Sequence, residues 1–342
     1  MSRKFKSIRV TDKIPPVGRE IYFMAKRIDD FDSDGSFLLA TMRVYKYYLP
    51  SYKQHYYESM KSMEDLYTAV NLANILRSEN IELPYIPIVS IDFECFKSIY
   101  DTDIDGIVPM PSHNDRSLGR HAVQVINVDK DSSSIMFPNS WGNKWGKDGF
   151  GFLSSDYLNR YLKEICFAMD ASVGIDDEKI ERIKNTQDCN EIAGIWMEKN
   201  EKDSIDTDLN GKKLNIVWYS LRNMSGSFVE IFDLRTFEGQ RLGWAHLTHS
   251  HNDGDTVKKS CITELFIWPT FRKKGYGTLL ENYCVENALR MDSSILQISL
   301  YEMDDLKGID SPVRLFASKL GYVCILKPEI LPCINGFAEK KI

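Results

Sequence analysis

The sequence lacks the features typical of a secreted, membrane-spanning or metal-stabilised protein. Its 7 cysteines are scattered, odd in number and free of any C-x-x-C pair, which argues against a disulfide framework and a thiolate zinc site. No run of eighteen apolar residues occurs, and no apolar stretch of signal-peptide length follows the basic start of the chain. We therefore expect a cytoplasmic protein with free thiols and no membrane partner.

The charge balance lacks the basic excess of a nucleic-acid-binding protein. Lys plus Arg number 43 against 49 Asp plus Glu, so the formal net charge is -6, and we expect no nucleic-acid partner. What is present is ample core-forming material, with 43% hydrophobic and 12% aromatic residues, which rules out a disordered chain. A length of 342 residues predicts two domains.

The periodicity of apolar residues predicts two parts joined by a polar segment. Before residue 171, helical patterns and apolar runs predict elements over 35–48, 64–76, 87–93, 122–128 and 135–138. After residue 211, the pattern predicts strands over 214–221, 228–234, 241–248, 261–268 and 295–301, and helices over 277–291 and 312–320. We predict an α+β or mixed α/β fold. Its domains would span 1–170 and 212–342, around a charged helical connector over 171–211.

A strand, a basic turn and two glycines precede the helix predicted over 277–291. The turn reads Arg272-Lys273-Lys274-Gly275-Tyr276-Gly277-Thr278. Glycines let the backbone approach a ligand, and the amides and dipole of a helix start attract an anion. The three basic side chains add charge for a pyrophosphate. A surface turn with a solvated basic cluster is the alternative interpretation.

Two ordered motifs resemble the GNAT acetyltransferase superfamily. Residues 272–277 match its acetyl-CoA motif R/Q-x-x-G-x-G/A, and residues 310–322 match N-x-x-A-x-x-F-Y-x-K-L-G-F without a gap. The resemblance covers about residues 214–328. It implies that acetyl-CoA is the cosubstrate and an amine the acceptor. The residues that it assigns to acetyl-CoA are Phe266, Ile267, Arg272, Lys273, Lys274, Gly275, Tyr276, Gly277, Thr278 and Asp310.

Departures from that family bear on the mechanism. The tyrosine that often protonates the leaving CoA thiolate falls on Ala317, which leaves Tyr301 and Cys261 as weaker substitutes. The candidate base is Glu264 on the predicted fourth strand, because an amine must lose a proton before it attacks a thioester. An outward-facing strand residue paired with a lysine is the alternative for Glu264. The family's Asn also falls on Asp310.

The two helices that usually form one wall of the family's acceptor site are missing between its first two strands. Here residues 214–221 run through the short polar segment 223–227 into 228–234, which predicts a hairpin. The wall of the acceptor site must therefore come from another part of the chain.

Three histidines, His246, His249 and His251, precede a polar turn. No cysteine is near them in the sequence, and their spacing places them on both faces of a strand. We interpret them as histidines close to a turn and expect no metal site.

Residues 119–126 and 138–151 resemble the papain-like cysteine peptidases. They match G-x-H-A-V and N-S-W-G-x-x-W-G-x-x-G-Y/F, so the family's catalytic base falls on His121 and the Asn that orients it on Asn139. A gapless match of the nucleophile motif to residues 28–38 places Phe37 at the cysteine and Phe31 at the oxyanion glutamine. The resemblance therefore implies a two-lobed papain-like domain without its chemistry. An active hydrolase that uses Ser36 in a shifted register is the alternative.

Together these motifs predict an acetyl-CoA-dependent N-acetyltransferase whose peptidase-like domain serves recognition or support. The alternatives are a CoA-binding regulatory protein without turnover and an atypical peptidase. We expect the two domains to pack together, so that the peptidase-like domain or the connector completes the acceptor site. The favoured acceptor is then a polypeptide amine, and loose tethering of the domains is the alternative.

Overall fold

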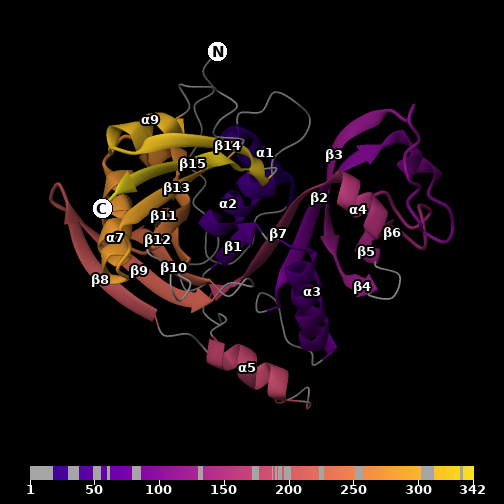
Figure 1. The fold of residues 1–342 in the computed structure, drawn as a ribbon, viewed down its shortest axis with the longest axis horizontal. Helices are drawn as coiled ribbons and strands as arrows, with labels where there is room; N and C mark the ends of the chain where they lie inside the picture. Colours follow the sequence, from indigo (N-terminus) through magenta and orange to yellow (C-terminus); the bar gives the residue numbers. More distant parts are fainter. Residues whose placement is uncertain are drawn as a thin grey trace.

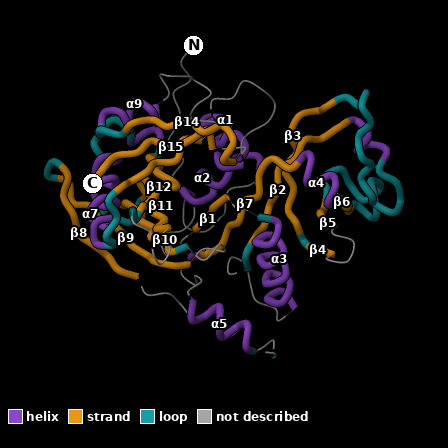
Figure 2. Tube along the Cα trace, viewed as in Figure 1, coloured by secondary structure: helices purple, strands orange, loops and turns teal. Residues whose placement is uncertain are grey.

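The structure is a computed structural model of the chain. It describes residues 18–29, 38–48, 55–59, 62–78, 86–129, 134–171, 177–186, 188, 191, 195, 202–222, 227–250, 257–301, 312–331 and 334–342. Three sheets with helices against them make an α+β protein (Figures 1 and 2), which confirms the predicted class. None of the described helices combines the length and apolarity needed to cross a membrane. Below, the first half means the described residues 18–171 and the second half the described residues from 202 onward.

The first half contains two small sheets. The larger has the order β1-β7-β2-β3, from β1 (His55–Ser59), β7 (Leu162–Asp170), β2 (Ile88–Phe96) and β3 (Ser117–Val125). The smaller has the order β4-β5-β6, from β4 (Asn127–Asp129), β5 (Ser134–Pro138) and β6 (Phe150–Ser154). The helices here are α3 (Met63–Ser78), the short η1 (Lys97–Asp101) and α4 (Ser155–Tyr161). Phe93 of β2, at 0% exposure, joins the two sheets through an edge-to-face contact with Phe137 of β5, and it makes a second such contact with Tyr157 of α4.

The second half is built on one eight-stranded sheet of order β14-β15-β13-β12-β11-β10-β9-β8. Its strands are β8 (Lys202–Leu209), β9 (Lys212–Arg222), β10 (Phe228–Thr236), β11 (Arg241–Ser250), β12 (Lys259–Ile267), β13 (Ile295–Tyr301), β14 (Val323–Leu331) and β15 (Ile334–Lys341). Strand β12 leads through η3 (Pro269–Phe271) into α7 (Tyr276–Arg290), and α9 (Pro312–Lys319) follows β13. The predicted hairpin is present, because β9 and β10 pair antiparallel from Arg222 opposite Phe228.

The segment predicted as a helical connector contains a strand as well as a helix. Helix α5 (Asp177–Asn185) lies in it, and so does β8, which pairs antiparallel with β9 at the edge of the eight-stranded sheet. In β8, half-buried Ile205, Thr207 and Leu209 alternate with exposed aspartates. This period of two is the pattern of a strand with one covered face. The overall polarity of the segment hides it in the sequence.

The sheet splits between its two parallel strands. β12 pairs with β13 only over residues 259–262 and 295–298, yet β12 continues to Ile267 and β13 to Tyr301. The register of β12 with β11 shifts between His246 and Leu247, which marks a bulge at the same level. Beyond Ile262 the two parallel strands therefore separate, and Glu264 is among the first residues of the free segment of β12.

Helices from both halves cover the eight-stranded sheet. On one face, α7 and α9 bury an apolar core that includes Leu280, Ala317 and Ile298. On the opposite face lie α1 (Gly18–Asp29), α2 (Leu38–Tyr48) and β1, which come from the first half (Figure 1). The second half also contributes to the large core of the first half, through Val217, Tyr219, Leu221, Val229 and Ile231. The two halves are thus joined by a shared apolar core.

Helix α1 is not among the sequence predictions, although its pattern is amphipathic. Ile21, Met24, Ala25 and Ile28 recur at helical spacing and pack in the same cluster as Trp244 and other aromatics of the second half. In α2, Tyr47 stacks on Trp268 with ring centroids 3.8 Å apart. Among its described residues, the second half has no helix between β9 and β10, where the resembled family has two. Helices α1 and α2 of the first half cover one face of its sheet instead.

Candidate functional site

The glycine-containing turn predicted to bind a phosphate has the geometry of an anion site. Gly275 precedes α7 with φ of +88°, a conformation that side chains other than glycine rarely adopt. The first hydrogen bond of α7 runs from the Leu279 amide to the Gly275 carbonyl, 3.0 Å away. The amides of Tyr276, Gly277 and Thr278 therefore come before the helix's own hydrogen bonds. Arg272, Lys273, Lys274 and Gly275 are all exposed beside them.

The other residues assigned to acetyl-CoA have different surroundings. The Phe266 side chain is 3% exposed and packs among Trp244, Trp268 and the α1–α2 pair. Its contribution to a ligand would thus come through its backbone, whereas Ile267 points to the core under α7. Tyr276 is also buried in that core, so only its amide faces the turn. Asp310 lies outside the described residues.

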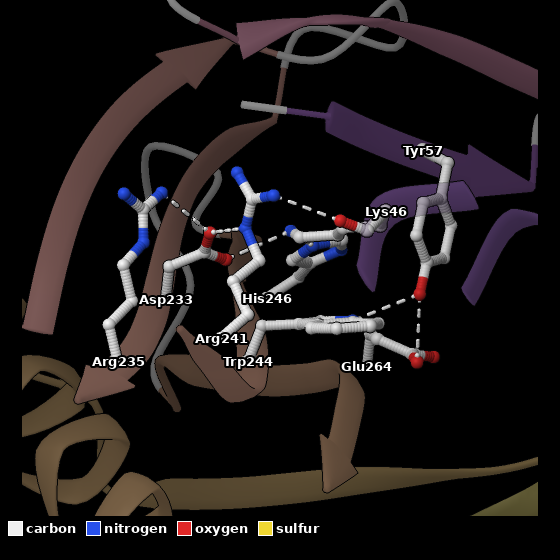
Figure 3. Close-up of polar contacts among 8 residues, drawn as sticks. All are labelled: Lys46, Tyr57, Asp233, Arg235, Arg241, Trp244, His246 and Glu264. Atoms are coloured by element: carbon white, nitrogen blue, oxygen red, sulfur yellow. Dashed lines mark hydrogen bonds and ion pairs between the residues drawn. The ribbon is translucent and has the colours of Figure 1, made fainter. Parts of the chain in front are cut away.

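Glu264 is held by two side chains of the first half, Arg43 and Tyr57, of which Figure 3 draws Tyr57. Its carboxylate accepts hydrogen bonds from Arg43 Nε at 2.7 Å and Arg43 Nη2 at 3.0 Å, and from the Tyr57 hydroxyl at 3.0 Å. The exposed fractions are 2% for Glu264, 3% for Arg43 and 3% for Tyr57. The sequence predicts either a base or an outward-facing residue paired with a lysine. The structure shows an inward-facing carboxylate paired with an arginine, and its role as a base stays a prediction.

A second buried ion cluster lies two strands away from β12, around Asp233 of β10. Its carboxylate contacts Lys46 Nζ at 3.3 Å, Arg241 Nε at 2.9 Å and Arg235 Nη2 at 3.1 Å. Lys46 Nζ is also 3.1 Å from His246 Nε2. Lys46 and Asp233 are both fully buried. Two cations of α2 thus meet the carboxylates of β12 and β10. Arg43 pairs with Glu264, and Lys46 contacts Asp233, a pair drawn in Figure 3.

Burial and neighbouring charges shift the ionisation of these groups in different directions. Burial lowers the pKa of Lys46 to about 8, although Asp233 beside it acts in the opposite direction. Burial alone would raise the pKa of Asp233, but Lys46, Arg241 and Arg235 outweigh it and hold this pKa well below its usual range. Burial, together with the charge of Glu264, raises the pKa of Tyr57 well above 10. The Tyr57 phenol therefore stays protonated at neutral pH.

The two weaker candidates for the proton donor, Cys261 and Tyr301, lie on β12 and at the end of β13. Cys261 Sγ lies 3.5 Å from Ser299 Oγ across the β12–β13 pair. Tyr301 is the last residue of β13, opposite Ile334, and its side chain is outside the described part. Ala317, at the position of the family's tyrosine, is 0% exposed. The nearest described tyrosine hydroxyl to Glu264 is that of Tyr57, a residue that sequence reasoning missed because it belongs to the other half.

Two of the three clustered histidines face opposite sides of β11. His246 points to the first half and contacts Lys46, whereas His249 lies on the α7 side between Glu230 Oε2 at 2.9 Å and Ser260 Oγ at 2.7 Å. His251 is outside the described residues. Among the residues that the structure describes, no group of three or more His, Cys, Asp or Glu side chains is placed to hold a metal ion.

The peptidase-like motif brings its histidine and asparagine together. His121 Nε2 on β3 is 3.4 Å from Asn139 Oδ1, just after β5, and the Trp141 ring stacks on the imidazole. Burial lowers the pKa of His121, although Asn139 and Asp92 oppose this shift. The positions assigned to the nucleophile and the oxyanion donor, Phe37 and Phe31, lie outside the described residues.

Comparisons with known proteins return both families that the sequence resembles. No protein-family model matches the chain. The chain is 34% identical over 74 residues to an uncharacterized peptidase C1-like protein of Acanthamoeba polyphaga mimivirus, a stretch covering 21% of this chain and 24% of that protein. The chain thus spans about a quarter of that relative's length.

Solved structures of both families are also similar to the chain. Xylellain, a cysteine protease from Xylella fastidiosa, is 25% identical, with 25% of this chain and 32% of that chain covered and a TM-score of 0.22. The PaiA N-acetyltransferase from Thermoplasma acidophilum in complex with coenzyme A is 14% identical, with 33% of this chain and 61% of that chain covered and a TM-score of 0.26.

Proposed function

We propose that the protein is an acetyl-CoA-dependent N-acetyltransferase. The observation that carries this proposal is the combination of a split parallel strand pair, β12 and β13, with an exposed turn after η3 whose amides precede the hydrogen bonds of α7. The amides of residues 276–278 and the basic side chains of residues 272–274 would bind the pyrophosphate. The pantetheine arm would follow the segment of β12 that leaves β13, and the thioester would lie near Glu264.

In this proposal Glu264 accepts the proton of the acceptor amine. A carboxylate offers about four acceptor sites, and the hydrogen bonds from Arg43 and Tyr57 occupy three of them. Within the described part of the chain, one acceptor site on Oε2 thus stays available for the amine proton. The favoured acceptor is a polypeptide amine, because the acceptor side of the sheet is covered by helices of a half that resembles a peptidase.

The cofactor turn can be tested with Gly275→Val. A β-branched residue is strained at φ of +88°, and its Cβ would lie 3.4 Å from Leu209 Cδ2. The turn that presents the amides should therefore rearrange, and we expect acetyl-CoA affinity to fall at least 100-fold. The matched control is Gly321→Val, since Gly321 has φ of +84° and an added Cβ there would meet no described atom within 4 Å. Isothermal titration calorimetry that finds equal affinity in both variants would contradict the assignment.

A second candidate is a CoA-binding protein without turnover. The bidentate Arg43–Glu264 pair favours it, because both carboxylate oxygens already accept hydrogen bonds in the interior. The two candidates differ in one result. Only the transferase releases free CoA from acetyl-CoA when an amine acceptor is added.

The first half is proposed to lack peptidase activity. Its histidine and asparagine remain in contact, but Phe37 and Phe31 replace the nucleophile and the oxyanion donor of the family that it resembles. We expect no cleavage of a broad fluorogenic peptide library above a buffer blank. Cleavage that disappears in His121→Ala but persists in the control His113→Ala, an exposed histidine elsewhere in this half, would refute this expectation.

A further inference from the structure

Acetyl transfer needs a proton donor as well as a base, and this inference rests on the proposed function. When the amine attacks, a C–N bond forms and the C–S bond breaks, so that the nitrogen must lose a proton and the thiolate must gain one. General acids and bases at such steps contribute about 10²- to 10⁴-fold to the rate. Ala317, in the helix after β13, has no proton to donate.

Tyr57 brings a hydroxyl from the first half to the base of the second. Its Oη donates to Glu264 Oε1 at 3.0 Å and accepts a hydrogen bond from Trp244 Nε1 at 3.0 Å. The indole donor occupies a lone pair of the hydroxyl oxygen, which leaves the phenolic proton to point at the carboxylate (Figure 3). Arg43 fixes the same carboxylate from the other side. Trp244 thus orients the Tyr57 hydroxyl, and Arg43 orients the Glu264 carboxylate that the hydroxyl contacts.

We propose that Tyr57 is the proton donor to the leaving CoA thiolate and that Glu264 resupplies its proton. The amine proton passes to Glu264 as the C–N bond forms. The protonated carboxyl then becomes a donor to Tyr57 Oη, which frees the phenolic proton to move to the sulfur as the C–S bond breaks. At the end Glu264 is again ionised, Tyr57 is again a phenol, and amide and thiol are the only products.

Two further features of the site agree with this relay. Burial and the charge of Glu264 raise the pKa of Tyr57 well above 10, so the phenol holds its proton while Glu264 is ionised. When Glu264 takes up the amine proton, that charge disappears and Tyr57 becomes a better proton donor. Glu264 also lies at the start of the segment where β12 leaves β13, and the proposed path of the thioester follows this segment. A proton donor for the thiolate must lie close to the position of the thioester sulfur, and Tyr57 contacts Glu264 at this point of β12.

The test compares Tyr57→Phe with Tyr56→Phe in the full-length protein. Tyr56 is the neighbouring tyrosine on β1 and is equally buried, at 2% against 3%. Each variant is titrated with acetyl-CoA, and its release of free CoA is measured with poly-L-lysine and with a peptide mixture bearing free N-termini. We expect Tyr57→Phe to keep its acetyl-CoA affinity within about twofold and to lose about 100-fold or more in turnover. Tyr56→Phe should keep both.

A second acyl donor separates proton donation from a structural role. With 4-nitrophenyl thioacetate the leaving thiolate is stable without a proton, so we expect Tyr57→Phe and the wild-type protein to react at similar rates. A merely structural Tyr57 would reduce the rate with both donors equally, and this result would overturn the proposal. Replacement of Tyr57 by 3,5-difluorotyrosine keeps the hydroxyl and should move the alkaline limb of the pH–rate profile to lower pH, whereas an unmoved limb would also overturn it.

The wild-type protein provides the remaining controls. If it binds acetyl-CoA but releases no CoA with either amine probe, the donor role of Tyr57 is refuted and the CoA-binding alternative is favoured. If it does not bind acetyl-CoA, the proposed function itself fails. The two failures are thus distinguished by the titration alone.

Discussion

Residues 212–342, expressed without the rest of the chain, are expected not to fold. The sheet face that α1, α2 and the first half's core cover would become exposed, including eight large side chains that are all at most 8% exposed: Val217, Tyr219, Leu221, Val229, Ile231, Trp244, Phe266 and Trp268. Burial of each contributes about 1.5–3 kcal/mol. Together they match or exceed the roughly 5–15 kcal/mol that stabilises a typical domain.

The fragment also loses polar partners. Glu264 and Asp233 would lose Arg43 and Lys46, and the sheet would lose its edge strand β8. Circular dichroism and size-exclusion chromatography should therefore show an unfolded or aggregated fragment. Co-expression of residues 1–201 with residues 202–342 is the control, and we expect a soluble complex of the two pieces. A cooperative thermal transition in isolated 212–342 would favour loosely tethered domains instead.

Asp233→Asn is expected to destabilise the protein strongly, whereas Lys46→Met should have a small effect. The asparagine leaves Lys46, Arg235 and Arg241 buried with no carboxylate between them. Removing one partner of a buried ion pair typically costs about 3–5 kcal/mol. Lys46→Met instead leaves Asp233 with two arginines and replaces a buried charge with an apolar side chain of similar length, so we expect a loss below about 1 kcal/mol.

Chemical denaturation of the two variants and of the double variant measures this asymmetry. A matched surface control is Asp292→Asn, because Asp292 is 81% exposed and pairs with Lys258 at 3.4 Å. Exposed pairs contribute about 0–1 kcal/mol, so this variant should remain close to the wild type. Equal losses for Asp233→Asn and Asp292→Asn would mean that the buried cluster contributes nothing to the contact between the halves.

Most elements predicted from periodicity, and the two motif regions, are present in the structure. The turn over 272–278 lies between a strand and a helix as predicted, and His121 contacts Asn139 as the peptidase motif implies. Such features depend on neighbours in the chain, on the spacing of apolar residues or on motifs whose residues act together. The strand pattern of β8 was also present in the sequence, but alternating aspartates made it resemble a solvated linker.

Only the tertiary structure decided what the polar residues of α2 and β1 do. Arg43 and Glu264 are 221 residues apart in the chain, and Tyr57 and Glu264 are 207 apart. On a helix, arginine and lysine three residues apart predict a face exposed to solvent, because buried cations are rare without partners. The partners of Arg43 and Lys46 lie on the eight-stranded sheet of the second half. No local pattern encodes which sheet face a helix will cover. The sequence by itself therefore determined the two kinds of fold and the glycine-containing turn over 272–278, whereas the joining of the halves around Glu264 depended on long-range packing.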